Sequence, residues 1–248
     1  MSATHILITG ANQGLGHTVA QQLLAREATL PNHPPSVHIY VGARSQEKAD
    51  KACSDLKKYA AEGNTLEPVI IDLASDASIE ALGNKIEKLD ILINNGAILG
   101  DMQESTSPAA VRKNFANVYE TNVFGTAALT YALIETIRKS KEPRVVNVSS
   151  GLGSIQNQLD PNWAFHGMTA LVYPSSKTAL NGVTAIMSKQ YPDVKFVAVD
   201  PGYTSTAFNG HSGHQPVEVG AHAISHAVLD PKAKTASYVE KEGVVLPW

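Results

Sequence analysis

Short runs of apolar residues alternate along the chain with longer segments in which apolar residues recur every three to four positions. The run Ile91-Leu92-Ile93 is continuously apolar, which is typical of a strand that is covered on both faces of a parallel sheet. The expected strands are 6–9, 37–41, 67–71, 91–94, 144–148, 195–199 and, more weakly, 237–239. The expected helices are 16–26, 46–60, 78–88, 111–139, 175–191 and 218–229. This alternation predicts an α/β fold: a doubly wound parallel sheet with helices on both faces.

The 248 residues are 43% hydrophobic, which is enough for one large core. No internal repeat, low-complexity tract or flexible linker divides the chain, and the proline-rich stretch 30–35 reads as a loop between the first helix and the second strand. We therefore expect one domain over residues 1–248.

Charge and cysteine content narrow the possible partners. The 20 Lys and Arg against 23 Asp and Glu give a net charge of −3, so no broad basic surface is expected and a nucleic-acid partner is excluded. A single cysteine, Cys53, fits a reducing compartment and is expected to pack in the core. The N-terminus has no signal-peptide pattern, and no stretch reaches the ~18 consecutive apolar residues of a spanning helix. We expect a soluble, cytoplasmic protein without a membrane partner.

A glycine-rich turn links the first expected strand to the first expected helix. Gly10, Gly14 and Gly16 are four and two positions apart, so backbone N–H groups and the positive end of the helix dipole can face a phosphate. A plain packing turn is the alternative interpretation. Ligands of doubly wound sheets bind outside the carboxyl ends of the strands, which is where this turn lies.

The glycine pattern that starts at Thr9, the pair Asn94-Asn95 after the fourth strand and the later Tyr173-x-x-x-Lys177 together resemble the short-chain dehydrogenases/reductases. The resemblance covers nearly the whole chain and implies a single Rossmann-type, dinucleotide-binding catalytic domain. It implies that the cofactor contacts Gly10, Asn12, Gln13, Gly14, Leu15, Gly16, Arg44, Asp72, Leu73, Asn94, Asn95, Gly96, Tyr173, Lys177, Pro201, Gly202, Thr204 and Thr206.

The end of the second strand favours NADP(H) over NAD(H). Ala43 stands where the family's acidic residue would hold the ribose hydroxyls, and Arg44 follows with a guanidinium that suits a 2′-phosphate. Gln13 departs from the Lys or Arg that many NADP-binding relatives carry. Asp72 resembles the residue that contacts the adenine amino group, with a helix N-cap as the alternative. Gly96-Ala97 exchanges the family's usual order, so a positive φ is expected at Gly96.

Tyr173 and Lys177 lie four residues apart, so they share one face of a helix, and the ammonium is expected to lower the pKa of the phenol. The resemblance implies that Tyr173 is the general acid in reduction and the base in oxidation, and that Lys177 tunes it and binds the nicotinamide ribose. Ser150 would polarise the carbonyl, with Ser149 as the alternative, and Asn122 would hold a water that links Lys177 to solvent.

The substrate pocket is expected between the loops 151–172 and 203–217. Ser150, Trp163, Tyr203 and Phe208 are the candidate substrate contacts, and they suit a moderately bulky apolar carbonyl compound, although Trp163 could equally pack its own loop down. His222 and His226 share a helix face, but no acidic third ligand accompanies them, so no metal is expected.

Three functions remain open. The first is an NADPH-dependent carbonyl reductase, and the second uses the same site as an NADP-dependent alcohol dehydrogenase. The third is a non-catalytic dinucleotide-binding regulator, which would be expected to have lost Tyr173 or Lys177. Monomer and homo-oligomer are both open.

Overall fold

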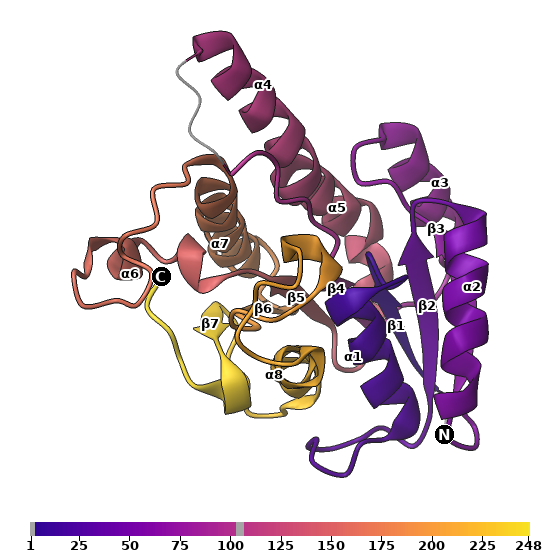
Figure 1. Cartoon of the computed structure of the whole chain (residues 1–248). Helices are drawn as coiled ribbons and strands as arrows, with labels where there is room; N and C mark the ends of the chain where they lie inside the picture. The colour runs from indigo at the N-terminus through magenta and orange to yellow at the C-terminus, as the bar shows by residue number, and fades with distance from the viewer. Residues whose placement is uncertain (1–2, 103–106) are drawn as a thin grey trace.

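The computed structural model describes residues 3–102 and 107–248, and these residues form a seven-stranded sheet (Figure 1). The predicted domain 1–248 also includes residues 1–2 and 103–106, which lie outside the described residues. The strands run parallel in the order β3-β2-β1-β4-β5-β6-β7. They are β1 (Thr4–Ile8), β2 (Val37–Ala43), β3 (Thr65–Ile70), β4 (Ile91–Asn94), β5 (Arg144–Val148), β6 (Lys195–Val199) and β7 (Ser237–Val239).

Helices connect the strands in the alternation that the apolar pattern predicts. The α-helices are α1 (Gly14–Ala25), α2 (Gln46–Leu56), α3 (Asp76–Lys85), α4 (Pro108–Tyr119), α5 (Thr126–Ile137), α6 (Ile155–Leu159), α7 (Val172–Gln190) and α8 (Val217–Leu229). Shorter helical turns are η1 (Lys57–Tyr59), the π-helical η2 (Glu120–Gly125), η3 (Gly151–Gly153), η4 (Ala207–Asn209) and η5 (Lys241–Gly243).

Two apolar layers fix the helices to the sheet. Helices α1, α2 and α8 cover one face of the sheet, and α3, α5 and α7 cover the other (Figure 1). Ile6 and Ile8 belong to the layer under the first set of helices, and Leu7 belongs to the layer under the second. Because successive side chains of a strand alternate between faces, each strand that is apolar throughout supplies both layers. Cys53 packs in the first layer and is a free thiol.

The long helix expected over 111–139 is interrupted. It begins at Pro108, and α4 and α5 are joined by the π-helical turn η2. A Cβ atom added to Gly125 would lie 1.8 Å from the backbone oxygen of Leu73, so the helix can pass the sheet here only with a glycine. The apolar pattern carries no information about this close approach. The short helix α6 was also not expected.

The direction of sheet growth reverses between β1 and β4. After β1 the chain adds β2 and β3 on one side, and it then returns to place β4 on the other side of β1. This is the switch point at which doubly wound sheets open a crevice at the carboxyl ends of the strands. Thr9 and Asn95 follow β1 and β4 at this point.

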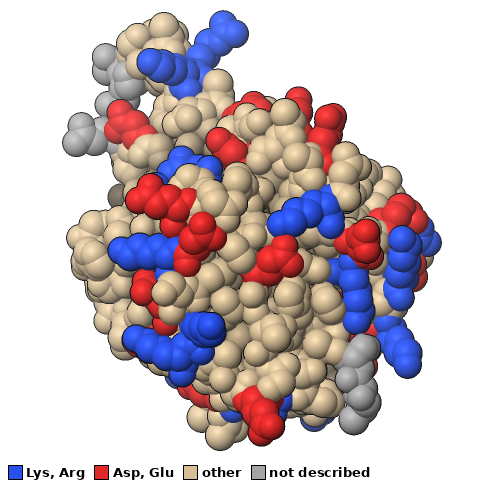
Figure 2. Space-filling model, turned by 90° about the vertical axis from the view of Figure 1, so that its right-hand side faces the viewer, with Lys and Arg blue, Asp and Glu red and all other residues tan. Residues whose placement is uncertain are grey.

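The surface carries acidic and basic side chains side by side. On the face that includes α2 and α3, Figure 2 shows blue and red residues intermixed, with no segregation of one sign. No helix within the described parts of the chain is long and apolar enough to cross a membrane.

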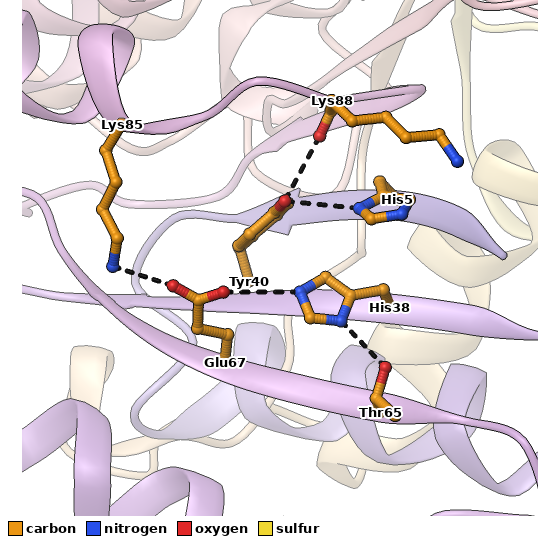
Figure 3. A network of polar contacts seen from close by, with 7 residues as sticks. All are labelled: His5, His38, Tyr40, Thr65, Glu67, Lys85 and Lys88. Carbon is orange, nitrogen blue, oxygen red and sulfur yellow. Dashed lines mark hydrogen bonds and ion pairs between the residues drawn. The ribbon is translucent and has the colours of Figure 1, made fainter.

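A polar network lies toward the amino ends of β1, β2 and β3, away from the carboxyl-end crevice (Figure 3). His5 and His38 are cross-strand partners whose ring centroids are 4.9 Å apart. Tyr40 contacts His5 through a 3.3 Å hydrogen bond, and Glu67 forms ion pairs with His38 at 3.7 Å and with Lys85 at 2.8 Å. Burial is the main reason that the pKa of each histidine is lowered.

Candidate active site

A cavity of about 790 Å³ opens at the carboxyl ends of the strands. Its walls come from the whole chain, from Thr9 after β1 to Leu246 near the C-terminus. Most of the sequence-predicted site residues line it, and Gly16, Asn94 and Asn122 are the exceptions.

The glycine-rich turn forms one end of this cavity. Gly10 and Gly14 have φ values of +63° and +56°, a conformation that other residues adopt only with strain. The first turn of α1 has no side-chain cap and no acidic residue, so its N–H groups and dipole are available to an anion. Asn12, Gln13 and Leu15 line the cavity beside them.

Gly16 has a packing role. A Cβ atom there would lie 2.5 Å from Asn95 Nδ2 and 2.7 Å from the Gly10 oxygen, so the start of α1 can approach these groups only with a glycine. Asn95 in turn donates from Nδ2 to the Thr9 oxygen at 2.8 Å. The glycine turn is therefore tied to the segment after β4.

Gly96 differs from expectation, because its φ is not positive. What it lacks is space for a side chain: an added Cβ would lie 3.1 Å from Leu73 Cδ1 and 3.2 Å from Thr9 Oγ1. The Gly96 N–H donates to this Thr9 hydroxyl at 2.8 Å. Close packing, and not backbone conformation, explains the glycine.

Asn94 forms hydrogen bonds that hold neighbouring elements of the fold together. Its side chain is buried and donates to Thr130 Oγ1 at 3.0 Å and to Asn147 Oδ1 at 2.8 Å. It ties β4 to β5 and α5 and does not line the cavity.

The cavity wall after β2 carries the residues that were expected to select the cofactor. Ala43 is buried at the end of the strand, and Arg44 is exposed and lines the cavity. Asp72 also lines the cavity and accepts a 3.0 Å hydrogen bond from the Ala74 N–H. The N-cap of α3 is Ser75, so Asp72 is not the cap that was its alternative interpretation.

Tyr173 and Lys177 lie in the first turns of α7 and line the opposite part of the cavity. Lys177 Nζ is 5.7 Å from the centre of the Tyr173 ring and donates to the Val148 oxygen at 2.8 Å. Burial lowers the pKa of Lys177 to about 8. Burial, assisted by the charge of Asp200, raises the pKa of Tyr173 above its ordinary value. This direction is opposite to the lowering of the phenol pKa that was expected from Lys177, and burial is its main cause.

Ser150 is the second residue after β5 and is the N-cap of η3. Its Oγ accepts a 3.3 Å hydrogen bond from the Leu152 N–H, and the residue lines the same cavity as Tyr173. Gly153 presses η3 onto α7, since an added Cβ would lie 2.8 Å from the Lys177 carbonyl carbon. The Ser149 hydroxyl is already used in a hydrogen bond within the protein, because its Oγ donates to Asn181 Oδ1 at 2.6 Å. Ser150 is thus the better placed of the two serines.

Asn122 lies in the π-helical turn η2 and is buried. Its Oδ1 accepts from the Ile98 N–H at 2.8 Å, and its Nδ2 donates to the Ile98 oxygen at 2.9 Å and to Ser176 Oγ at 3.1 Å. Its amide is therefore occupied in joining η2, the segment after β4 and α7. That Asn122 holds a water linking Lys177 to solvent stays a prediction.

The loop after β6 completes the wall. Gly202 has a φ of +72°, and Pro201, Gly202, Thr204 and Thr206 all line the cavity. The Thr204 hydroxyl donates within its own loop, to the oxygens of Pro201 and Gly202 at 3.1 Å each. This loop is therefore internally braced.

Aromatic side chains from the two predicted pocket loops meet over the cavity. Phe165 contacts Trp163 and Tyr203, with ring centroids 5.4 Å and 5.8 Å apart. Phe208 lies against Tyr173 with centroids 5.8 Å apart. Trp163, Tyr203 and Phe208 all line the cavity, and Phe165 lines it with them.

His222 and His226 both lie on α8, with ring centroids 6.3 Å apart. Among the described residues, no three His, Cys, Asp or Glu side chains are grouped so that they could hold a metal ion.

Several residues of the site were missed from the sequence, and three of them contact or adjoin predicted site residues. Ser176 binds Asn122, Asp200 lines the cavity after β6, and Tyr238 in β7 donates to the Ser150 oxygen. Asp200 could have been singled out as an acid at a strand end. Ser176 and Tyr238 carry no pattern that distinguishes them from packing residues.

Comparison with known proteins gives concordant matches. A family model described as short chain dehydrogenase matches residues 4–216. The short-chain dehydrogenase anuI of Penicillium roqueforti is 36% identical over 254 residues, covering 97% of this chain and 95% of that protein.

Two solved structures are similar over their whole length. The NADPH-bound carbonyl reductase from chicken fatty liver superposes with a TM-score of 0.79, and the carbonyl reductase Sniffer of D. melanogaster with 0.75. Each is 25% identical, with 100% of both chains covered.

Proposed function

The chain belongs to the short-chain dehydrogenase/reductase family, and from this membership we propose that it is a carbonyl reductase that uses NADPH to reduce a ketone or aldehyde. One observation carries the proposal: Ser150, Tyr173 and Lys177 line the same cavity as the glycine-rich turn at Gly10 and Gly14. A phosphate-bearing cofactor that starts at this turn and extends along the cavity would bring its far end to a hydroxyl, a phenol and an amine.

The residues present fit a nicotinamide dinucleotide. The left-handed conformations of Gly10 and Gly14 and the uncapped start of α1 suit a pyrophosphate. Arg44, with Ala43 in place of an acidic side chain, suits the 2′-phosphate of NADPH. When bound, the reduced nicotinamide supplies the hydride. The NADPH-bound state of the similar chicken reductase supports the same cofactor.

The chain's own residues would supply the proton and stabilise the developing charge. As the carbonyl carbon gains its new C–H bond, the Tyr173 O–H bond breaks and its proton goes to the carbonyl oxygen, leaving a phenolate. Ser150 donates a hydrogen bond to the same oxygen, and the Lys177 ammonium offsets the phenolate charge. A phenol with its ordinary pKa of about 10 is protonated at neutral pH, and burial, which raises the pKa of Tyr173, acts in the same direction. Reduction starts from this protonated form, whereas oxidation of an alcohol starts from the phenolate.

The residues that line the cavity indicate the class of substrate, and they also indicate how much of the chain takes part in catalysis. The aromatic side chains of Trp163, Tyr203 and Phe208 suit a moderately bulky apolar carbonyl compound. Because the walls include residues from Thr9 to Leu246, we propose that the whole chain acts as one catalytic unit.

The test is a screen of ketones and aldehydes with NADPH and with NADH, read by loss of cofactor absorbance. We expect turnover with NADPH, and a fall of about 10²- to 10⁴-fold in kcat/KM for Tyr173→Phe with NADPH binding retained. Tyr131→Phe removes an exposed phenol from α5 and should behave as wild type. Turnover that survives Tyr173→Phe would contradict the assigned proton donor, and a wild-type protein that reduces none of the compounds would contradict the proposed reaction.

A further inference from the structure

The peptide unit between Ser150 and Gly151 is contacted by a polar side chain on each of its two residues. Its carbonyl oxygen accepts a 2.5 Å hydrogen bond from Tyr238 Oη. On its other side, Gly151 lies against the carboxylate of Asp200, whose pKa is raised mainly by burial, while the amides of Gly202 and Gly151 oppose this rise. Tyr238 and Asp200 come from β7 and from the end of β6, so two strands beyond β5 reach back to the same peptide.

The surroundings of Tyr238 favour its role as a hydrogen-bond donor to the Ser150 oxygen. Its side chain is fully buried, and burial raises the pKa of its phenol, so the hydroxyl keeps its proton over the working pH range. The Trp248 ring stacks on the Tyr238 ring, with centroids 5.7 Å apart and planes inclined by 28°. The phenol is therefore held on one side by an aromatic contact and at its tip by the Ser150 oxygen.

Asp200 links the loops that follow β5 and β6. Its Oδ1 accepts a 2.9 Å hydrogen bond from the Gly202 N–H. Its Oδ2 lies against Gly151, because a Cβ atom added to that glycine would be 2.9 Å away from it. The carboxylate thus joins the segment that carries Ser150 to the loop of Pro201 and Gly202, and it also lines the cavity.

Fixing this peptide fixes the serine that precedes it. Ser150 has φ −165° and ψ 146°, and its ψ angle is the torsion that sets the orientation of the following peptide. With the C=O bound by Tyr238 and Asp200 packed against Gly151, the peptide cannot rotate without losing the Tyr238 hydrogen bond in a partly buried place. The Cα–Cβ bond of Ser150 is then held relative to this peptide, and the Leu152 N–H binds its Oγ.

We propose that Tyr238 and Asp200 are positioning residues that hold the Ser150–Gly151 peptide and thereby aim the Ser150 hydroxyl at the substrate carbonyl. The inference rests on the proposed function for the role of Ser150. For the holding of the peptide it rests on the Tyr238 hydrogen bond and on the contact of Asp200 with Gly151. Neither residue takes part in proton or hydride transfer.

A double-mutant cycle tests the action through Ser150. Tyr238→Phe keeps the ring and removes the donor, so we expect kcat to fall roughly tenfold, within the ~10²-fold that a misplaced catalytic group can cause. NADPH affinity should stay within about twofold of wild type. In a Ser150→Ala background the same change should have almost no further effect, because the group it positions is gone. Tyr59→Phe, at a remote phenol, should leave kcat unchanged in both backgrounds. Equal effects of Tyr238→Phe in the two backgrounds would overturn the proposal.

Hydrogen–deuterium exchange tests the holding of the peptide without reference to activity. We expect Tyr238→Phe and Asp200→Asn each to speed exchange of the Gly151 amide, while amides in α1 keep their wild-type rates. Asparagine replaces one of the two carboxylate oxygens of Asp200, which meet Gly202 and Gly151, by an NH2 group, so Asp200→Asn provides a second variant if Tyr238→Phe does not fold. Unchanged exchange at Gly151 in a folded variant would overturn the proposal. If the wild-type protein reduced no carbonyl compound, the proposed reaction would fail while this measurement still decided whether the peptide is held.

Discussion

Lys177 donates a hydrogen bond from Nζ to the backbone oxygen of Val148, over 2.8 Å, inside the cavity. Its pKa is lowered by burial to about 8, so the ammonium loses its proton at a much lower pH than an exposed lysine does. Binding of an anionic cofactor favours the charged form. We therefore expect NADPH affinity to be constant between about pH 6 and 7.5 and to fall above about pH 8, by up to tenfold for each pH unit.

Fluorescence titration with NADPH from about pH 6.5 to 9.5 measures this dependence. Lys177→Met should bind more weakly and lose the break near pH 8, whereas Lys189→Met, at the exposed end of the same helix, should keep it. A break of the same size in Lys177→Met would assign the titration to another group.

Arg44 is expected to discriminate between the two nicotinamide cofactors. Removing a hydrogen bond between charged groups costs about 1.5–3 kcal/mol, so Arg44→Ala should raise the Kd for NADPH by roughly 10- to 100-fold. The Kd for NADH should change less than about twofold, because NADH has no 2′-phosphate. Arg112→Ala, an exposed arginine on α4, is the control. Equal losses for the two cofactors would refute the assignment of Arg44.

Gly125 and Gly182 should respond in opposite directions to alanine. The Gly125 Cβ would meet the Leu73 oxygen at 1.8 Å, so Gly125→Ala must displace the backbone and should destabilise by about 1–3 kcal/mol or more. Gly182 lies within α7, with no heavy atom within 4 Å of an added Cβ, so Gly182→Ala should stabilise by about 1 kcal/mol through helix propensity. Urea unfolding measures the free energy of unfolding of both variants. A Gly125→Ala protein as stable as wild type would show that η2 can move away from Leu73 at little cost.

The histidine network of Figure 3 should make stability sensitive to mild acid. The pKa values of His5 and His38 are lowered mainly by burial, so the folded protein resists protonation that the unfolded chain accepts below about pH 6.5. The contribution to stability is complete above that pH and is lost as the pH falls further.

Thermal melts at about pH 7 and 5 check this sign. His38→Gln should show a smaller fall in Tm between the two pH values than wild type, and His166→Gln, at an exposed position, should show the same fall as wild type. A fall in Tm that is independent of His38 would place the acid sensitivity elsewhere.

Much of the fold was predictable because it depends on local pattern. Each predicted strand overlaps an observed one, since a continuously apolar run such as Ile91-Leu92-Ile93 needs cover on both faces. The π-helical turn was not predictable, because the contact between Gly125 and Leu73 joins segments that are far apart in the chain.

In the candidate site, too, some residues were predictable from local sequence motifs and others were not. Gly10, Tyr173 and Lys177 were recognisable because each belongs to a short motif next to a strand or helix end. Tyr238 was not, because its hydrogen bond to the Ser150 oxygen spans 88 residues and no neighbouring residue marks it. The pKa of Tyr173 was misjudged for a related reason: burial is a property of the assembled fold.

The reach of the cavity wall from Thr9 to Leu246 has a consequence for how the protein acquires binding ability. During refolding, a chain that has assembled only β1 to β5 lacks the loop after β6 and the C-terminal wall, and contacts of such long sequence separation form slowly. Affinity for a dinucleotide should therefore emerge only when the last edge strand has docked. The fluorescence change of bound NADPH would then report the final step of folding, and it should appear later than the helical circular dichroism signal.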